Sequence, residues 1–168
     1  LGDEVDLSDL DNRINAIRLI HEKLYQTEDI SRINLKEYIH ELNENMFSLS
    51  KRHVEIEEHI DDISLSTKKA IPLGLIVNEL ATNAMKYGFI DGQEAVFSVD
   101  LTEDKTKSQY ILIISNSGNA FPKDVTLDKA NTLGLQLISA LVSQLEGTIE
   151  LEREPHPVFT IRFPIGEE

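Results

Sequence analysis

Hydrophobic positions along the chain change their spacing, and each spacing predicts a different element. Residues 8–25 and 34–49 carry apolar side chains three or four positions apart, which is the period of an amphipathic helix. Residues 54–60 alternate apolar and charged side chains, as a half-buried strand does, and residues 63–65 predict a short second strand. Helical spacing returns over residues 67–87, where Leu80, Ala84 and Met85 belong to the expected buried face.

The second half of the chain is predicted to be mostly strand. Residues 95–101 alternate in polarity, whereas residues 110–114 are almost continuously apolar, which is typical of a central strand buried on both faces. A loop rich in Asn, Ser, Gly and Pro follows over residues 115–132. A helix over residues 133–145 is expected to end at Gly147 in the C′ position. The last two predicted strands are residues 148–151 and 158–163.

This order of elements predicts the fold class. Helices packed on one face of a mixed sheet make an α+β protein, a two-layer α/β sandwich. The pattern changes near residues 26–34, from an all-helical start to a mixed remainder. We therefore expect two parts, residues 1–31 and residues 32–168.

Composition and charge exclude several classes of function. The chain has 30 acidic and 16 basic residues and a net charge of −14, so nucleic acid is not an expected partner. The absence of cysteine excludes disulfides and thiol chemistry. No stretch approaches the ~18 apolar residues of a membrane span, and the N-terminus is acidic rather than basic and apolar. A cytoplasmic location without direct membrane contact is expected.

Three polar residues on the long helix carry the strongest chemical signal. Glu79, Asn83 and Lys86 follow one another at helical spacing, so they share one face of residues 67–87. An amide oxygen can ligate Mg²⁺, a carboxylate can activate a nucleophile, and an ammonium can pair with phosphate. A solvent-facing polar stripe would have the same spacing, so the pattern alone leaves both interpretations open.

Two glycines also indicate a phosphate-binding site, but each is weaker evidence than the three polar residues. Gly118 follows a buried strand and allows a close backbone approach, although a plain turn would also use it. Gly134 stands at the mouth of the predicted helix 133–145, where free N–H groups favour anions. Local packing would explain that glycine equally well.

Taken in order, these segments resemble a known superfamily. Residues 70–87 are similar to the N box of the ATPases that include gyrase, Hsp90, histidine kinases and MutL. Within that superfamily, their sequence most resembles histidine kinases with the second, HWE-related type of dimerisation domain. Residues 132–147 resemble the G2 region of that group. Residues 17–26 resemble the second helix of its dimerisation hairpin, and residues 33–38 the start of its catalytic domain.

The resemblance implies a fold and an activity. The fold would be the Bergerat-type ATP-binding sandwich, preceded by a helical remnant of the dimerisation domain in residues 1–31. The activity would be that of a sensor histidine kinase, which binds ATP and Mg²⁺ and transfers the γ-phosphoryl group to a histidine. That histidine is expected on a helix preceding Leu1. A response regulator and a second copy, joined through the N-terminal helix, are the implied partners.

The resemblance also implies roles for individual residues. Asn83 would ligate Mg²⁺, and Glu79 would be the catalytic base or polar activator. The remaining expected nucleotide-binding residues are Asn78, Lys86, Tyr87, Asn116, Gly118, Ala120, Leu133, Gly134 and Leu135.

The G1 box departs from the family pattern Asp-x-Gly-x-Gly. Asn116 replaces the aspartate that accepts a hydrogen bond from the adenine amino group, and the lost charge is expected to weaken ATP binding ~10-fold. Ala120 replaces a glycine, which would strain the loop if the backbone there needs a positive φ. These changes keep a second hypothesis open, a degenerate kinase-like module that acts as a scaffold. A third, an anti-sigma-factor kinase, is disfavoured by the N-terminal helix.

Overall fold

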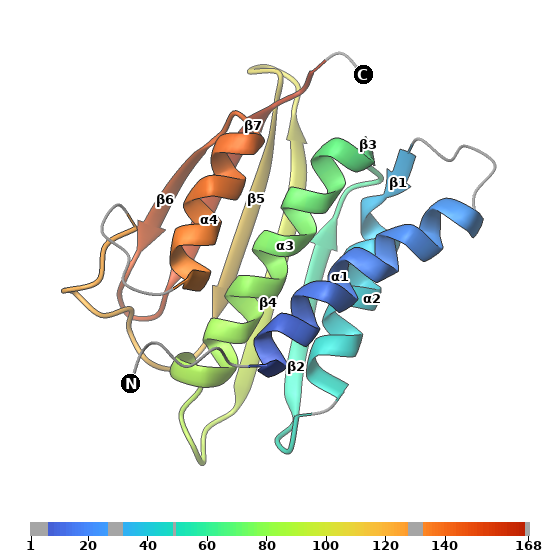
Figure 1. Cartoon of the computed structure of the whole chain (residues 1–168). Coiled ribbons are helices and arrows are strands. Elements are labelled where there is room, and N and C mark those ends of the chain that lie inside the picture. The colour runs from blue at the N-terminus through green and yellow to red at the C-terminus, as the bar shows by residue number, and fades with distance from the viewer. Residues whose placement is uncertain (1–6, 27–31, 49, 128–132, 167–168) are drawn as a thin grey trace.

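One mixed sheet of five strands forms the back layer of the molecule (Figure 1). The computed structural model describes residues 7–26, 32–48, 50–127 and 133–166. The strand order is β2-β4-β5-β7-β6, with β2 parallel to β4 and the other neighbours antiparallel. The strands are β2 (Val54–Ile60), β4 (Ala95–Asp104), β5 (Gln109–Asn116), β6 (Thr148–Glu152) and β7 (Val158–Pro164).

The helices gather on one side of this sheet, as Figure 1 shows. They are α1 (Leu7–Gln26), α2 (Leu35–Ser48), α3 (Thr67–Asn83) and α4 (Leu133–Gln144). Helix α1 packs against α2 and α3 rather than standing apart from the domain. The predicted α+β sandwich is therefore confirmed. A small antiparallel sheet, which pairs β1 (Arg32–Asn34) with β3 (Ser64–Ser66), was only half predicted, because the pattern gave no sign of β1.

Tyr38 joins the three helices α1, α2 and α3. Its hydroxyl group donates to the backbone oxygen of Ala16 at 3.0 Å, and burial raises the pKa of the phenol well above its usual value. A Cβ atom at Gly74 would lie 2.1 Å from the tyrosine oxygen, so only glycine lets the ring pass over α3. Helix α2 itself starts as expected, with the Asn34 side chain accepting from the backbone N–H of Glu37 at 3.0 Å.

The central strand β5 is buried on one face only, which corrects the expectation for residues 110–114. Leu112 and Ile114 are fully buried beneath the helices, whereas Ile111 and Ile113 are half-buried on the opposite face. The helices cover a single face of the sheet, so side chains of the other parity remain partly open. A continuous apolar run thus predicted a strand correctly but overstated its burial.

The long helix ends in a wider turn that the sequence did not predict. After Asn83 the hydrogen bonding changes, and Ala84–Gly88 form a π-helical turn, η1. Because π turns bond to the fifth residue instead of the fourth, side-chain directions shift after Asn83. Met85 is consequently 39% exposed, which corrects its assignment to the buried face.

The end of α4 also differs from the prediction. Glu146, not Gly147, has the left-handed backbone, with a φ of 57°. The N–H groups of Glu146 and Gly147 donate to Ser143 and Val142, which is the Schellman arrangement with Glu146 at C′. The glycine serves packing instead, because a Cβ there would lie 2.5 Å from the backbone oxygen of Arg162.

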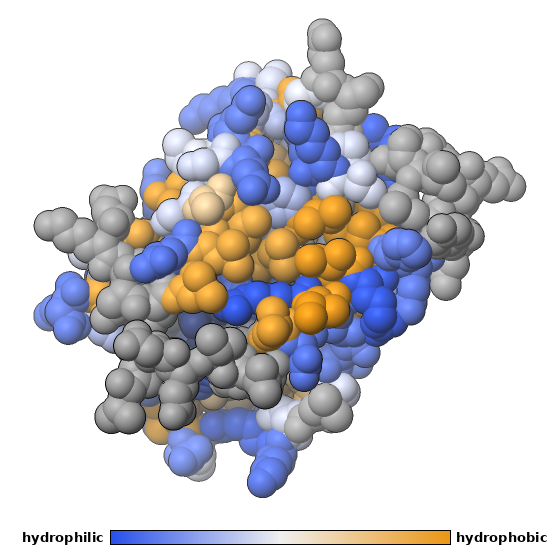
Figure 2. Space-filling model, viewed as in Figure 1, coloured by the Kyte–Doolittle hydropathy of each residue, from blue (hydrophilic) through white to orange (hydrophobic). Residues whose placement is uncertain are grey.

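Helix α1 has one buried and one exposed apolar face. Ala16, Leu19 and Ile20 belong to the core, whereas Leu10, Ile14 and Ile17 are 42%, 55% and 47% exposed. In Figure 2, apolar side chains gather on this helical side of the molecule. Within the described ranges, no helix is both long enough and apolar enough to span a bilayer.

Candidate functional site

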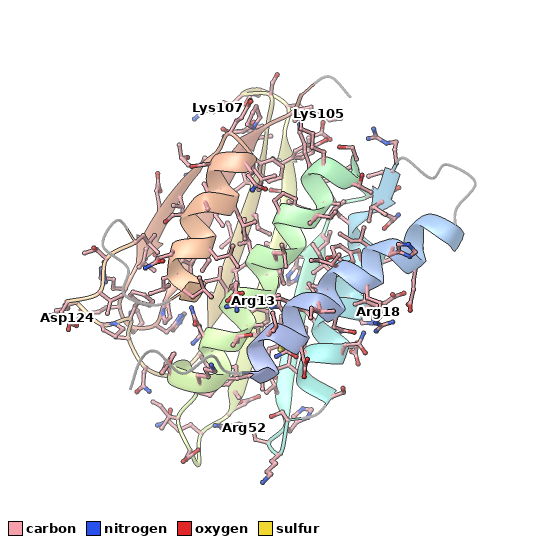
Figure 3. The ribbon with its side chains drawn as sticks, in the orientation of Figure 1. Arg13, Arg18, Arg52, Lys105, Lys107 and Asp124 are labelled. Carbon is pink, nitrogen blue, oxygen red and sulfur yellow. The ribbon has the colours of Figure 1, made fainter. Side chains whose placement is uncertain are left out.

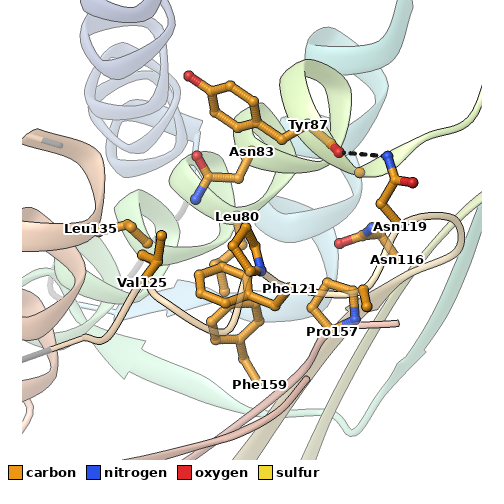
Figure 4. A pocket seen from close by; sticks show the side chains of 13 residues that line it. Leu80, Asn83, Tyr87, Asn116, Asn119, Phe121, Val125, Leu135, Pro157 and Phe159 are labelled. Atoms are coloured by element: carbon orange, nitrogen blue, oxygen red, sulfur yellow. Dashed lines mark hydrogen bonds between the residues drawn. The ribbon is translucent and has the colours of Figure 1, made fainter. Parts of the chain in front are cut away.

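A cavity of about 290 Å³ opens where the end of α3 meets the start of α4 (Figure 4). Most of its wall is apolar, and the lining side chains that carry polar groups are three asparagines and Tyr87. The residues that line it are Leu80, Asn83, Tyr87, Gly88, Asn116, Asn119, Ala120, Phe121, Pro122, Val125, Leu135, Pro157 and Phe159. An apolar cavity with few convergent polar groups is the usual form of a small-molecule site.

Five of the residues singled out in the sequence lie at this cavity. They are Asn83, Tyr87, Asn116, Ala120 and Leu135. They come from α3, η1, β5, the loop after β5 and α4, so segments more than fifty residues apart in sequence converge here. Ala120 does not have a positive φ, and the backbone strain expected there is absent.

The side chain of Asn116 is fixed by its neighbour. Its Nδ2 donates to the backbone oxygen of Ser117 at 2.9 Å, which leaves Oδ1 as the atom that can accept from a ligand. The residue is 7% exposed, at the end of β5. Gly88 packs directly on it, because a Cβ at Gly88 would lie 2.4 Å from Nδ2. Asn116 therefore presents a neutral hydrogen-bond acceptor to the cavity.

The loop after β5 interlocks with the π turn. Gly118 has a φ of +108°, and a Cβ there would lie 2.1 Å from the backbone oxygen of Gly88, so glycine is required for both reasons. Asn119 completes the contact: its backbone N–H donates to Gly88 at 2.7 Å and its Nδ2 to the oxygen of Tyr87 at 3.1 Å (Figure 4). Gly118 thus shapes the cavity without lining it.

Glu79, the expected catalytic residue, does not line the cavity and forms an ion pair with Arg13. It is 2% exposed, and both of its carboxylate oxygens are bound by the guanidinium group of Arg13. Arg13 itself belongs to α1 (Figure 3). One of these bonds, from Nη2 to Oε2, measures 3.1 Å. The pair is buried between α1 and α3, with side-chain exposures of 17% for Arg13 and 3% for Glu79. Nothing in the sequence pattern pointed to Arg13.

Gly134 lies against this pair at the start of α4. A Cβ there would be 2.9 Å from Oε2 of Glu79 and 3.9 Å from Nη2 of Arg13. The glycine therefore lets the N-terminus of α4 approach a buried charge pair. The expected site residues are consequently divided, since Asn83 lines the cavity while Glu79 and Gly134 meet beside it.

Three other expected residues lie away from the cavity. Asn78 is 2% exposed, and its Oδ1 has no hydrogen-bond partner in the part of the chain that the structure describes. Lys86 is exposed on the π turn, whose wider winding rotates it relative to the α-helical spacing. Leu133 is 63% exposed at the first position of α4. Residues 128–132, which belong to the predicted loop of residues 115–132, are outside the described ranges.

The apolar wall was missed by sequence reasoning. Phe121, Pro122 and Val125 come from the loop after β5, and Pro157 and Phe159 from the start of β7. The rings of Phe121 and Phe159 meet edge to face, with centroids 5.7 Å apart. Large apolar side chains inside this loop, at Phe121, Val125 and Leu127, were the available signal, since an exposed loop has little use for them.

A metal ion would find few protein ligands here. Among the described residues, no group of three His, Asp or Glu side chains could hold one. Asn83 offers one oxygen at the cavity, which suits Mg²⁺ only when phosphates and water complete its shell, as they do in many nucleotide sites. The donor set therefore fits a metal that arrives with a nucleotide, not a resident ion.

Comparison with protein families matches both parts of the chain. The model of histidine kinase-, DNA gyrase B- and HSP90-like ATPases matches residues 68–167, and a model described as histidine kinase matches residues 3–50. The sensor histidine kinase PdtaS of Mycobacterium tuberculosis is 28% identical over 159 residues, and that of Mycolicibacterium smegmatis is 23% identical. The chain spans about a third of the length of these relatives, 31% and 32%.

Solved structures show the same fold. The histidine kinase domain of a blue-light activated histidine kinase from Erythrobacter litoralis superposes with a TM-score of 0.84 at 21% identity, over 98% of this chain and 77% of that one. The Acinetobacter baumannii histidine kinase AdeS gives 0.62 at 16% identity, over 92% and 77% of the two chains.

Proposed function

The chain belongs to the histidine kinase-, DNA gyrase B- and HSP90-like ATPase family, and from this premise we propose that it is the catalytic part of a sensor histidine kinase. The observation that supports this most is the cavity in which Asn83, Asn116 and Leu135 converge from α3, β5 and α4. Residues 1–31 would be the partial dimerisation region and residues 32–168 the catalytic domain, acting in the cytoplasm.

The cavity fits the base of a nucleotide. Its volume of about 290 Å³ lies near the lower end of the ~300–1,000 Å³ typical of ligand pockets. Phe121 and Phe159 offer apolar surface to a flat ring, and Oδ1 of Asn116 offers an acceptor for an amino group. The phosphates would extend towards Asn83 and the N-terminus of α4, whose free N–H groups favour anions.

The reaction is a phosphoryl transfer. The lone pair of an unprotonated imidazole nitrogen forms the new P–N bond while the bond from the γ-phosphorus to the bridging oxygen breaks, and ADP leaves with that electron pair. Asn83 would hold Mg²⁺, which when bound neutralises phosphate charge. The chain's own contribution to catalysis is mainly to position the phosphates, because phosphoryl transfer requires little covalent catalysis by the protein.

Glu79 would accept the proton from the other ring nitrogen of the attacking imidazole, which becomes acidic as the P–N bond forms. In the structure both of its oxygens are occupied by Arg13, so the role requires that pair to open. A shift of α1 relative to α3 would accomplish this. The response regulator would then take the phosphoryl group from the histidine.

A titration with ATP, with and without Mg²⁺, tests the proposal. We expect saturable binding that depends on Mg²⁺, and we expect Asn83→Ala to remove the Mg²⁺ dependence. Absence of binding at millimolar ATP would overturn the kinase function and favour the scaffold hypothesis.

The exposed face of α1 supports a homodimer through this helix. Leu10, Ile14 and Ile17 recur at helical spacing and remain open to solvent, which is costly for a protein that stays monomeric. Light scattering checks the assembly. Ile14→Glu, which places a charge on this face, should leave a monomer if α1 carries the contact.

A further inference from the structure

Arg153 holds the loop that forms the apolar wall of the cavity. Its Nη1 donates to the backbone oxygens of Pro122 and Val125 at 2.6 and 2.7 Å. Its guanidinium group stacks over the ring of Phe121, 5.3 Å from the centroid. The backbone oxygen of Arg153 in turn accepts from the N–H of Phe121 at 3.0 Å. One residue thus makes four contacts with a segment that has no regular secondary structure.

The residues that Arg153 holds are those that line the cavity. Three of these residues, Phe121, Pro122 and Val125, contribute to the wall. The ring of Phe121 also contacts the ring of Phe159 on β7. A loop without helix or strand bonds would have to be ordered by the ligand, at a cost of ~1–2 kcal/mol for each residue fixed. The arginine supplies that order beforehand.

We propose that Arg153 is a positioning residue for the base of the nucleotide, and that it keeps the base site formed before ATP arrives. The inference rests on the proposed ATP-binding function. Arginine is suited to this role because one planar group can donate to carbonyls and stack on a ring at the same time. Lysine carries the same charge but offers no plane to stack.

Arg52 provides a matched control. It makes the same kind of contacts elsewhere: its Nη2 donates to Ile90 and Gln93 at 3.1 and 2.6 Å, and its guanidinium group lies 5.6 Å from the centroid of Phe89. None of these partners lines the cavity. Arg52→Met therefore removes a similar loop contact without changing the wall.

The experiment compares Arg153→Met, Arg153→Lys and Arg52→Met with the wild type. ATP affinity is measured by titration, stability by thermal unfolding, and loop order by hydrogen exchange of the Phe121 amide. We expect Arg153→Met to weaken ATP binding roughly tenfold and to speed exchange at Phe121, with Arg153→Lys intermediate. Arg52→Met should lose comparable stability but keep its ATP affinity.

Each outcome decides between the inference and its premise. If the wild type binds ATP and Arg153→Met binds equally well, the positioning role is overturned while the proposed function stands. Equal losses of affinity in Arg153→Met and Arg52→Met also overturn it, because the effect would then come from general destabilisation. If the wild type binds no ATP, the proposed function falls and the inference falls with it. Should Arg153→Met fail to fold, Arg153→Lys gives the same comparison.

Discussion

Glu79 and Asn83 lie one turn apart on α3, yet the structure gives them opposite surroundings. Asn83 faces an open cavity whose lining side chains carry no charge. Glu79 is buried under α1 in an ion pair with Arg13, beside the start of α4. One helix therefore borders two compartments, one lined by neutral groups and one that holds a charge pair. Under the proposed function the first would bind the nucleotide and the second would act in the chemical step. The difference suggests that affinity and turnover respond to different residues.

Removing Arg13 should have the largest effect. Arg13→Ala leaves the buried Glu79 carboxylate without its partner, and we expect the free energy of unfolding to fall by ~3 kcal/mol in urea titrations. Arg18→Ala is the matched control, because Arg18 pairs with Glu22 on the same helix at about half exposure. That change should cost at most ~0.5 kcal/mol. Equal losses would mean that the Arg13 pair is no better shielded from water than the Arg18 pair.

The two glycines that touch these compartments should separate affinity from turnover. A Cβ at Gly88 would press on Asn116, and a Cβ at Gly134 would press on Glu79. Each substitution by alanine should cost ~1–2 kcal/mol of stability through overpacking. Gly88→Ala should weaken ATP binding, whereas Gly134→Ala should lower the turnover of bound ATP. Titration measures the affinity, and ADP formation in the presence of the acceptor histidine measures the turnover of both variants. Identical profiles would contradict the division.

A charge introduced on the neutral side should change little. Asn116→Asp gains a charged acceptor for an amino group, but it loses the 2.9 Å bond to Ser117 and sets a carboxylate against that carbonyl oxygen. We expect ATP affinity to stay within about threefold, below ~1 kcal/mol. Asn116→Ala, which removes the acceptor, serves as the reference for a real loss. A gain of a hundredfold in Asn116→Asp would show that the native amide is a degraded site.

An exposed pair away from both compartments should give the smallest effect. The hydrogen bond between His40 and Glu58 raises the pKa of His40, against a smaller lowering by partial burial. A raised pKa in the folded state contributes stability below about pH 6.5, the unfolded value, and loses it as the pH rises through the folded value. The free energy of unfolding is compared between His40→Gln and the wild type, once below pH 6.5 and once above the folded pKa of His40. The difference between the two proteins should change by a few tenths of a kcal/mol.

The sequence predicted the helix and sheet layers and some of the residues that meet at the cavity. It did not predict which side chains contact the expected site residues. Periodicity located α2 and α4 because each has one clear apolar face, whereas α3 was located although it is buried on almost every side. The spacing of Glu79 and Asn83 correctly placed them one turn apart on α3. It could not show that Arg13, sixty-six residues earlier, would cover one of them, because a long-range ion pair leaves no local pattern.

The cavity wall escaped prediction for a similar reason. Phe121 and Val125 lie in a loop whose shape depends on Arg153, almost thirty residues later. The π turn was also hidden, since Ala84 to Tyr87 have ordinary helical composition. The wider winding shows only in the backbone, where the N–H of Phe89 donates to the oxygen of Ala84. Local pattern specifies elements, whereas the exact walls of a site are set by contacts between them.

The widened turn at Ala84–Gly88 makes the length of this segment critical. Deleting one residue would let the chain close as an ordinary α-helix, which changes direction by ~100° and length by ~1.5 Å per residue. Gly88 would then no longer meet Gly118, and the start of the loop after β5 would lose the hydrogen bond from Asn119 to Gly88. An insertion or deletion between Asn83 and Gly88 should therefore be far more damaging than a substitution in the same five positions.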